Sequence, residues 1–214
     1  MPNERLVSTP HGEARIVARR AKRPAATLLL THGAGGGIDA PDLLRLARTL
    51  PQQDVSVTLV EMPWRVAGKK IAPAGTVLDE CYRAAVDTMR MRTPLVVGGR
   101  SAGARSAARI ARSVGARGLL ALAFPLHPPG RPERTRIDEL EGARVRTLVV
   151  QGENDPFGRP EEFPGDLELT AVPFADHSFK VPKSAPVTQA EALDVILEAT
   201  LEWIVRDVVG NRGD

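Results

Sequence analysis

The chain has 214 residues, of which 43% are hydrophobic and 26% are charged. This is an ordinary globular composition, and the length is sufficient to bury a core, so we expect a single domain over residues 1–214. The net charge of +3 is small, and its densest basic group, residues 15–23, fits a solvated hairpin edge better than a nucleic-acid contact. The single cysteine, Cys81, excludes an intramolecular disulfide framework and a multi-cysteine metal site.

Targeting segments are not evident in the sequence. The first seven residues contain no apolar signal segment, and the longest apolar run, residues 119–124, is far below the ~20 residues that span a bilayer. We therefore expect a cytoplasmic protein with no membrane partner.

Short apolar or β-branched runs recur along the chain and predict strands. Residues 6–8 and 14–18 flank a turn-rich tetrapeptide, so they predict an N-terminal hairpin. The other predicted strands are 25–30, 55–60, 95–97, 119–124, 148–150 and, nearer the sheet edge, 167–172.

Amphipathic stretches between these runs predict helices. They cover residues 42–50, 76–91, 102–114 and a last stretch from Thr188 to Ile204. Thr76 with Asp79, and Thr188 with Glu191, resemble capping boxes. This alternation predicts an α/β fold with a mostly parallel central sheet and helices on both faces. Residues 127–146 make only a short excursion, so no large cap is expected.

The strongest functional signal is the G-x-S-x-G motif of residues 99–103, between a predicted strand and a predicted helix. A serine in this context is exposed at a sharp turn above the sheet, and the flanking glycines avoid clashes. Ser101 is therefore the candidate nucleophile. The N–H of Ala102, at the positive end of the helix, is a candidate oxyanion donor. The alternative is a Gly/Ser loop that merely caps the helix.

A second signal is the glycine-rich segment 31–37, directly after the strand 25–30. Such a loop can supply a second oxyanion donor, from Ala34 or, with a shift of one residue, from Gly35. We assign His32 a structural role and place it, with Gly35, on the possible pocket rim. A phosphate-binding loop is disfavoured because the G-x-x-x-x-G-K-[ST] pattern is absent.

A serine nucleophile needs a base, and in this context the chain order is Ser, acid, His. Of the four histidines, only His177 follows a suitable acid, Asp155, which comes just after the strand 148–150. The predicted catalytic residues are therefore Ser101, Asp155 and His177. Glu153 is the alternative acid, and Asp176 should point away from its neighbour His177.

Further loop residues are possible members of the pocket rim. They are Trp64, Arg65, His127 and Phe157. The basic segment 64–70 could attract an acidic substrate, but a solvated loop is the better interpretation. Arg105 lies in the first turn of the helix 102–114, where the dipole disfavours a cation, so it predicts a carboxylate partner.

The sequence resembles the α/β-hydrolases, and within them a small lidless group described as dienelactone-hydrolase-like, with testis-expressed and chromatin-regulator relatives. The resemblance implies a serine esterase that uses the same three residues on a small-molecule acyl substrate, with no metal or cofactor. Dienelactone hydrolases themselves use a Cys nucleophile where this chain has Ser101. The chromatin relatives are scaffold subunits, so a non-catalytic binding or scaffold protein is the alternative. The matching segments are 32–37, 62–68, 99–103, 124–130, 151–158 and 176–179.

Overall fold

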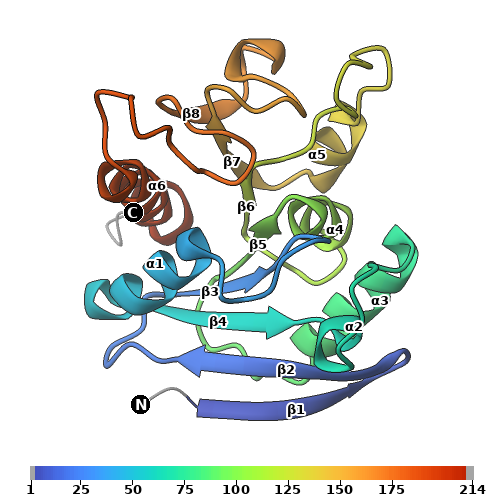
Figure 1. The fold of residues 1–214 in the computed structure, drawn as a ribbon. Coiled ribbons are helices and arrows are strands. Elements are labelled where there is room, and N and C mark those ends of the chain that lie inside the picture. The colour runs from blue at the N-terminus through green and yellow to red at the C-terminus, as the bar shows by residue number, and fades with distance from the viewer. Residues whose placement is uncertain (1–2, 211–214) are drawn as a thin grey trace.

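A computed structural model describes residues 3–210, so the first two and last four residues of the predicted domain lie outside the described range. Eight strands form one sheet through the middle of the molecule (Figure 1). The strands are β1 (Asn3–Thr9), β2 (Gly12–Arg19), β3 (Ala26–Thr31), β4 (Val55–Glu61), β5 (Leu95–Arg100), β6 (Gly118–Leu122), β7 (Arg146–Gly152) and β8 (Glu168–Val172).

The strand order is β1-β2-β4-β3-β5-β6-β7-β8. The hairpin strands β1 and β2 pair antiparallel, and β2 pairs antiparallel with β4. All other pairs, from β4 through β3 to β8, are parallel. The predicted fold class is confirmed: the sheet is mostly parallel and carries an N-terminal hairpin.

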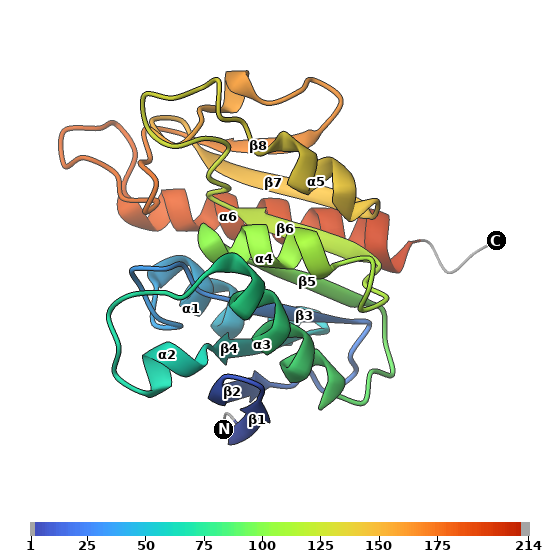
Figure 2. The same ribbon diagram turned by 90° about the vertical axis from the view of Figure 1, so that its right-hand side faces the viewer.

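Helices cover both faces of the sheet, as the unbroken apolar strands require. One face carries α1 and α6, and the other carries α3, α4 and α5 (Figure 2). Alternate residues of each strand serve the two layers, so Leu28 and Leu30 face α1 and α6 whereas Leu29 faces α3. The α-helices are α1 (Pro41–Thr49), α2 (Pro63–Val66), α3 (Gly75–Asp87), α4 (Ala102–Ile110), α5 (Ile137–Ala143) and α6 (Gln189–Trp203). The other helical turns are η1 (Leu50–Gln53), η2 (Pro160–Glu162) and the π-helical η3 (Ile204–Val209).

One of the two predicted capping boxes is present. Thr188 accepts a hydrogen bond from the Glu191 N–H at the start of α6, as predicted. The Thr76–Asp79 box is wrong, because α3 starts after Ala74 without a side-chain cap. Asp79 is instead drawn to α4, where Ser106 and Arg109 donate to its carboxylate. The helix α3 also ends at Asp87, before the expected residue 91.

Tyr82 fixes two central strands from the α3 side. Its hydroxyl lies 2.7 Å from the carbonyl oxygens of both Leu29 on β3 and Gly98 on β5. Burial raises the pKa of Tyr82 well above its ordinary value, and the Gly98 hydrogen bond lowers it by less. The neutral phenol therefore links β3 to β5, the strand that the candidate nucleophile follows.

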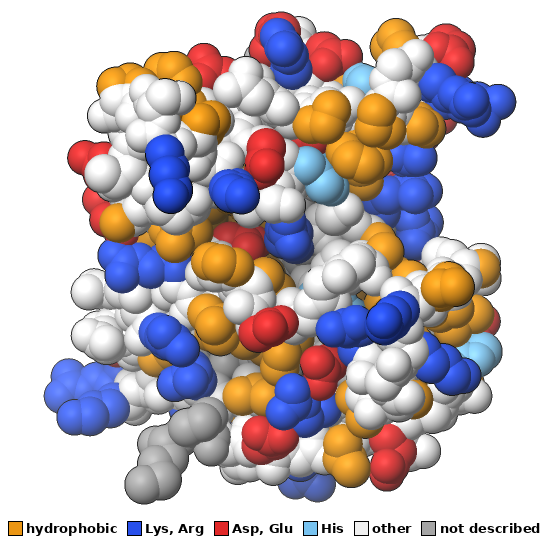
Figure 3. Space-filling view, in the orientation of Figure 1, with side chains coloured by type: hydrophobic (Ala, Val, Ile, Leu, Met, Phe, Trp, Pro, Cys, Tyr) orange, Lys and Arg blue, Asp and Glu red, His pale blue; other side chains and the backbone are white. Residues whose placement is uncertain are grey.

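The edge of the sheet where the parallel strands end is not covered by a cap domain within the described residues. Between β6 and β7 the chain adds only the short helix α5 and its connecting loops. None of the helices in residues 3–210 has both the length and the apolar character needed to cross a bilayer. On the face seen in Figure 3, basic and acidic side chains are interspersed over the surface.

Candidate active site

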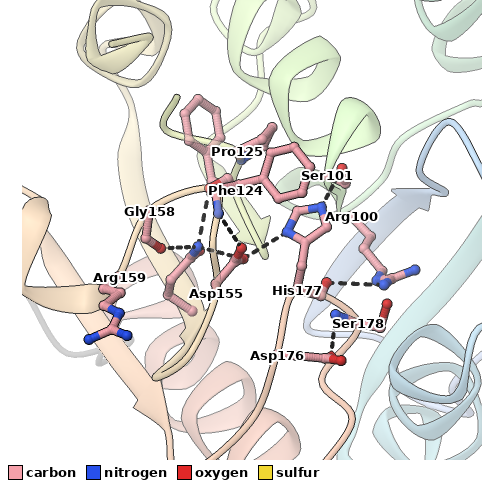
Figure 4. Close-up of polar contacts among 12 residues, drawn as sticks. Arg100, Ser101, Phe124, Pro125, Asp155, Gly158, Arg159, Asp176, His177 and Ser178 are labelled. Carbon is pink, nitrogen blue, oxygen red and sulfur yellow. Dashed lines mark hydrogen bonds and ion pairs between the residues drawn. The ribbon is translucent and has the colours of Figure 1, made fainter. Parts of the chain in front are cut away.

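The predicted catalytic side chains lie in three loops at the carboxyl ends of parallel strands. Ser101 follows β5, Asp155 follows β7 and His177 follows β8. Parallel strands bring these ends to one edge of the sheet, where ligands bind in open α/β folds. Residues far apart in the chain therefore meet above this edge (Figure 4).

The imidazole of His177 lies between the other two side chains (Figure 4). Its Nε2 is 2.9 Å from Ser101 Oγ, and its Nδ1 is 2.7 Å from Asp155 Oδ2. Asp155 is fully buried, whereas the His177 side chain is 19% exposed. A carboxylate at Nδ1 can hold that proton, which leaves the Nε2 lone pair directed at the hydroxyl.

The turn around Ser101 depends on two glycines. Ser101 has φ 54° and ψ −116°, a left-handed conformation that is strained for a residue with a side chain. A Cβ on Gly99 would lie 2.7 Å from the Gly103 carbonyl carbon, and a Cβ on Gly103 would lie 2.6 Å from the His32 carbonyl oxygen. The motif therefore has glycine where backbones touch, and this contact fixes the start of α4 against the loop after β3.

Both predicted oxyanion donors have backbone N–H groups that remain free. Ala102 is the first residue of α4, so its N–H has no acceptor within the helix. Among residues 3–210, neither Ala34 nor Ala102 donates a hydrogen bond from its N–H. A Cβ on Gly33 would lie 3.3 Å from Ser101 Cβ, so the glycine loop that carries Ala34 lies beside the nucleophile. A Cβ on Gly35 would have no neighbouring atom within 4 Å.

Gln151 is a site residue that the sequence analysis missed. Its Nε2 donates to Asp155 Oδ2 at 2.8 Å and to the Gly158 carbonyl at 2.8 Å, while the Phe157 N–H donates to Asp155 Oδ1 at 2.8 Å. These donors compensate for the burial of the carboxylate and fix its direction. Phe157, one of the rim candidates, also stacks its ring on His177, with centroids 4.2 Å apart. The available signal for Gln151 was a polar residue in a buried strand.

Other acids near the base point away from it. Glu153, the alternative acid, accepts a hydrogen bond from the Phe174 N–H instead of His177. The Asp176 carboxylate accepts the N–H groups of Ser178 and Lys180, within its own loop. Asp155 is thus the acid that contacts His177.

The predicted role of segment 64–70 is partly wrong. Trp64 lies in α2 and is 5% exposed, because its indole packs edge-on against His32 with centroids 5.2 Å apart. Arg65 is half-buried in the same helix, and only the residues after α2 are solvated. Trp64 lines a cavity of about 710 Å³ together with Val77 and Lys69, whereas the three predicted catalytic residues do not line it.

Both ring nitrogens of His32 form hydrogen bonds with the backbone, which fits the structural role expected for it. Its Nδ1 donates to the Gly33 carbonyl at 2.8 Å, and its Nε2 accepts the Met62 N–H at 3.0 Å, which requires a neutral ring. Burial lowers the pKa of His32, in keeping with this arrangement. The ring thereby ties the glycine loop after β3 to the end of β4.

His127 lies on the loop after β6, and its ring contacts neither Ser101 nor Asp155 by a hydrogen bond. Its Nδ1 faces the Pro128 carbonyl at 2.9 Å and its Nε2 faces Glu162 at 2.8 Å, so both nitrogens act as donors to acceptors. Burial lowers the pKa of His127, but the Pro128 carbonyl and Glu162 together raise it above its ordinary value. The Arg159 N–H, and to a lesser extent His127, lower the pKa of Glu162.

Arg105 has the carboxylate partner that its position predicted. Its Nε and Nη2 bind the two oxygens of Glu139 on α5 at 2.8 and 2.6 Å. Among the described residues, no group of three or more His, Cys, Asp or Glu side chains is placed to hold a metal ion.

Comparison with known proteins gives consistent results. The sequence pattern of the alpha/beta hydrolase domain family matches residues 24–205. No curated protein sequence matches the chain. Similar solved structures include a lidless serine hydrolase from Xanthomonas campestris, with 17% identity, TM-score 0.70 and 94% of both chains covered. They also include a dienelactone hydrolase from Anabaena variabilis, with 18% identity, TM-score 0.72 and 97% of this chain and 99% of that chain covered.

The close approach at Gly103 predicts a specific stability difference. We expect Gly103→Ala to lower the free energy of unfolding by about 1–3 kcal/mol, because the new Cβ overlaps the His32 backbone, which cannot move easily. Gly142→Ala, in the open space on α5, should raise it by up to about 1 kcal/mol. Urea unfolding of both variants measures the difference, and equal effects would contradict the packing described.

The His127–Glu162 pair predicts a pH-dependent contribution to stability. The His127 contribution is complete below its ordinary pKa of 6.5 and is lost as pH rises through the raised folded-state pKa. The Glu162 contribution is complete above 4.5 and is lost as pH falls through the lowered folded-state pKa. We therefore expect His127→Gln to lower the melting temperature most between pH 4.5 and 6.5, by about 2–4 °C, and less at alkaline pH. A difference that does not vary with pH would exclude this coupling.

Proposed function

The chain belongs to the alpha/beta hydrolase domain family, and from this premise we propose that it is a serine hydrolase that cleaves carboxylic esters or related acyl compounds. The resemblance found in the sequence is thereby confirmed at the level of the family. In this proposal Ser101 is the nucleophile, His177 the base and Asp155 the acid that orients it.

One observation carries the proposal: His177 contacts Ser101 Oγ and Asp155 Oδ2 at the same time, through opposite ring nitrogens. A serine hydroxyl is a weak nucleophile until a base removes its proton. A binding or scaffold protein has no need of this alignment or of the strained φ of 54° at Ser101. Similar folds include proteins described as serine hydrolases, which supports the same reaction class.

The proposed acylation step follows from these contacts. His177 Nε2 takes the Oγ proton as Oγ bonds to the substrate carbonyl carbon, and the carbonyl electron pair moves to the oxygen. The N–H groups of Ala34 and Ala102 would bind that oxyanion, and one such donor typically contributes ~10²–10³ in rate. The positive end of α4 favours the same charge. The bond to the leaving alcohol then breaks, and the alcohol oxygen takes the Nε2 proton.

Deacylation repeats the same proton transfers, with a water molecule as the nucleophile. His177 removes a proton from a water molecule, whose oxygen attacks the ester carbonyl on Ser101. The acid leaves, and Ser101 Oγ recovers its proton from Nε2. Asp155 retains its charge throughout, and its three N–H donors make that favourable in a buried place.

The uncapped edge of the sheet favours a small or flexible acyl substrate. Within residues 3–210, no cap domain covers the site, and the Phe157 ring supplies an apolar surface beside His177. The proposed reaction uses only side chains and backbone N–H groups of this chain.

Labelling with a fluorophosphonate probe tests the proposal. The probe phosphonylates an activated serine and releases fluoride, so wild type should be labelled and Ser101→Ala should not. His177→Ala should be labelled about 10³-fold more slowly or less, because the hydroxyl loses its base.

Ser113→Ala is the matched control, since Ser113 is an exposed serine beyond α4. It should be labelled like wild type. Equal labelling of wild type and Ser101→Ala would refute the enzyme proposal and favour the scaffold alternative.

A further inference from the structure

The guanidinium of Arg100 lies beside two loops of the site. Arg100 is the residue before the candidate nucleophile, at the end of β5. Its Nη2 donates to the backbone carbonyl of His177 at 3.1 Å (Figure 4). Its Nη1 lies 3.8 Å from where a Cβ on Gly36 would be, so it also lies near the glycine loop. The Arg100 side chain is 13% exposed.

A buried carboxylate lies behind this guanidinium. Asp42, in the first turn of α1, is 1% exposed, and its Oδ2 is 3.8 Å from Arg100 Nε. Within the described residues, neither carboxylate oxygen of Asp42 accepts a hydrogen bond from a side chain. Arg100 is therefore its sole ion-pair partner there, and an isolated charge at this depth would be costly. Burial raises the pKa of Asp42, and Arg100, followed by the backbone N–H groups of Asp42 and Leu43, opposes that shift.

The loop that carries the base is held by individual contacts, among them the Asn154 N–H to the Ala175 carbonyl and the Phe174 N–H to Glu153. His177 lies between β8 and α6, in residues 173–188, where the chain has only turns and bends. The Asp176 carboxylate ties this loop to itself, through Ser178 and Lys180. The Arg100 bond instead ties the His177 backbone to the turn that carries Ser101.

We propose that Arg100, anchored by Asp42, is a positioning residue that holds the His177 backbone so that the imidazole stays between Asp155 and Ser101. The inference rests on the proposed function. Arg100 does not touch the reacting atoms, so its effect should fall on kcat with little change in KM. A displacement of about 1 Å at a base can reduce a rate by about 10²-fold.

Chemical rescue tests this role. Arg100→Ala should lower kcat for p-nitrophenyl acetate by about 10²-fold and leave a buried hole beside the Asp42 carboxylate. Guanidinium ion at about 20 mM, far below the molar range that unfolds proteins, should enter this hole and restore kcat at least about 10-fold. The double variant Arg100→Ala with Asp42→Asn should not be rescued, because the anchoring charge is gone.

Arg105→Ala is the matched control. Arg105 is also a partly buried arginine, but its carboxylate partner Glu139 lies on α5, away from His177. Guanidinium should leave its kcat unchanged. Unchanged kcat in Arg100→Ala, or loss without rescue in a variant whose melting shows a folded protein, would overturn the proposal. If Arg100→Ala does not fold, Arg100→Lys must show a reduced kcat with KM retained, and wild-type kcat there would likewise overturn it.

A spectroscopic measurement separates this inference from the proposed function. The Nδ1 proton of His177, shared with Asp155, should give a low-field proton resonance in wild type, whether or not esters are cleaved. We expect Arg100→Ala to lose this resonance and guanidinium to restore it. A resonance that persists in Arg100→Ala would refute the positioning role even in an active enzyme, whereas loss and rescue in a protein without esterase activity would refute only the proposed function.

Discussion

The site depends on one close approach between backbones. The first turn of α4 lies directly against the loop after β3, at a distance that leaves no room for a side chain on Gly103 or Gly99. Between these two glycines, Ser101 has a positive φ and lies at the carboxyl end of β5. The close approach also places the glycine loop that contains Ala34 beside Ser101, which Ala102 follows directly.

Two buried carboxylates at this edge of the sheet differ in the groups that compensate their charge. Asp155 receives hydrogen bonds from Gln151, Phe157 and His177, so its charge is well compensated. Asp42 has Arg100 as its only ion-pair partner among the described residues, besides the backbone N–H groups at the start of α1. The first arrangement suits a group that must stay ionised beside a base during a reaction. The second makes the carboxylate and the guanidinium depend on each other, which suits an anchor.

Local patterns in the sequence were sufficient for the fold and for the three residues that meet in the loops. Continuous apolar runs mark buried parallel strands, and a serine between glycines marks the turn between β5 and α4. The errors arose where a partner distant in the chain decides the outcome. From the local sequence Asp79 resembles a helix cap, but in the fold its carboxylate accepts hydrogen bonds from Ser106 and Arg109 on α4. Trp64 likewise resembles part of a solvated loop, but in the fold its indole packs against His32. The local signal for Gln151 is only a polar residue in a buried strand, and Arg100 has none, since their roles come from loops that only the tertiary fold assembles.

The central claim is that catalysis proceeds through a covalent bond at Ser101. Mass spectrometry of peptides from protein quenched in acid during turnover of p-nitrophenyl acetate tests this claim most directly. We predict an acetyl group on the peptide that contains Ser101, and none on that peptide when His177 is replaced by alanine. Hydrolysis that proceeds with the acetyl group on a different side chain, or with Ser101 absent, would contradict the account.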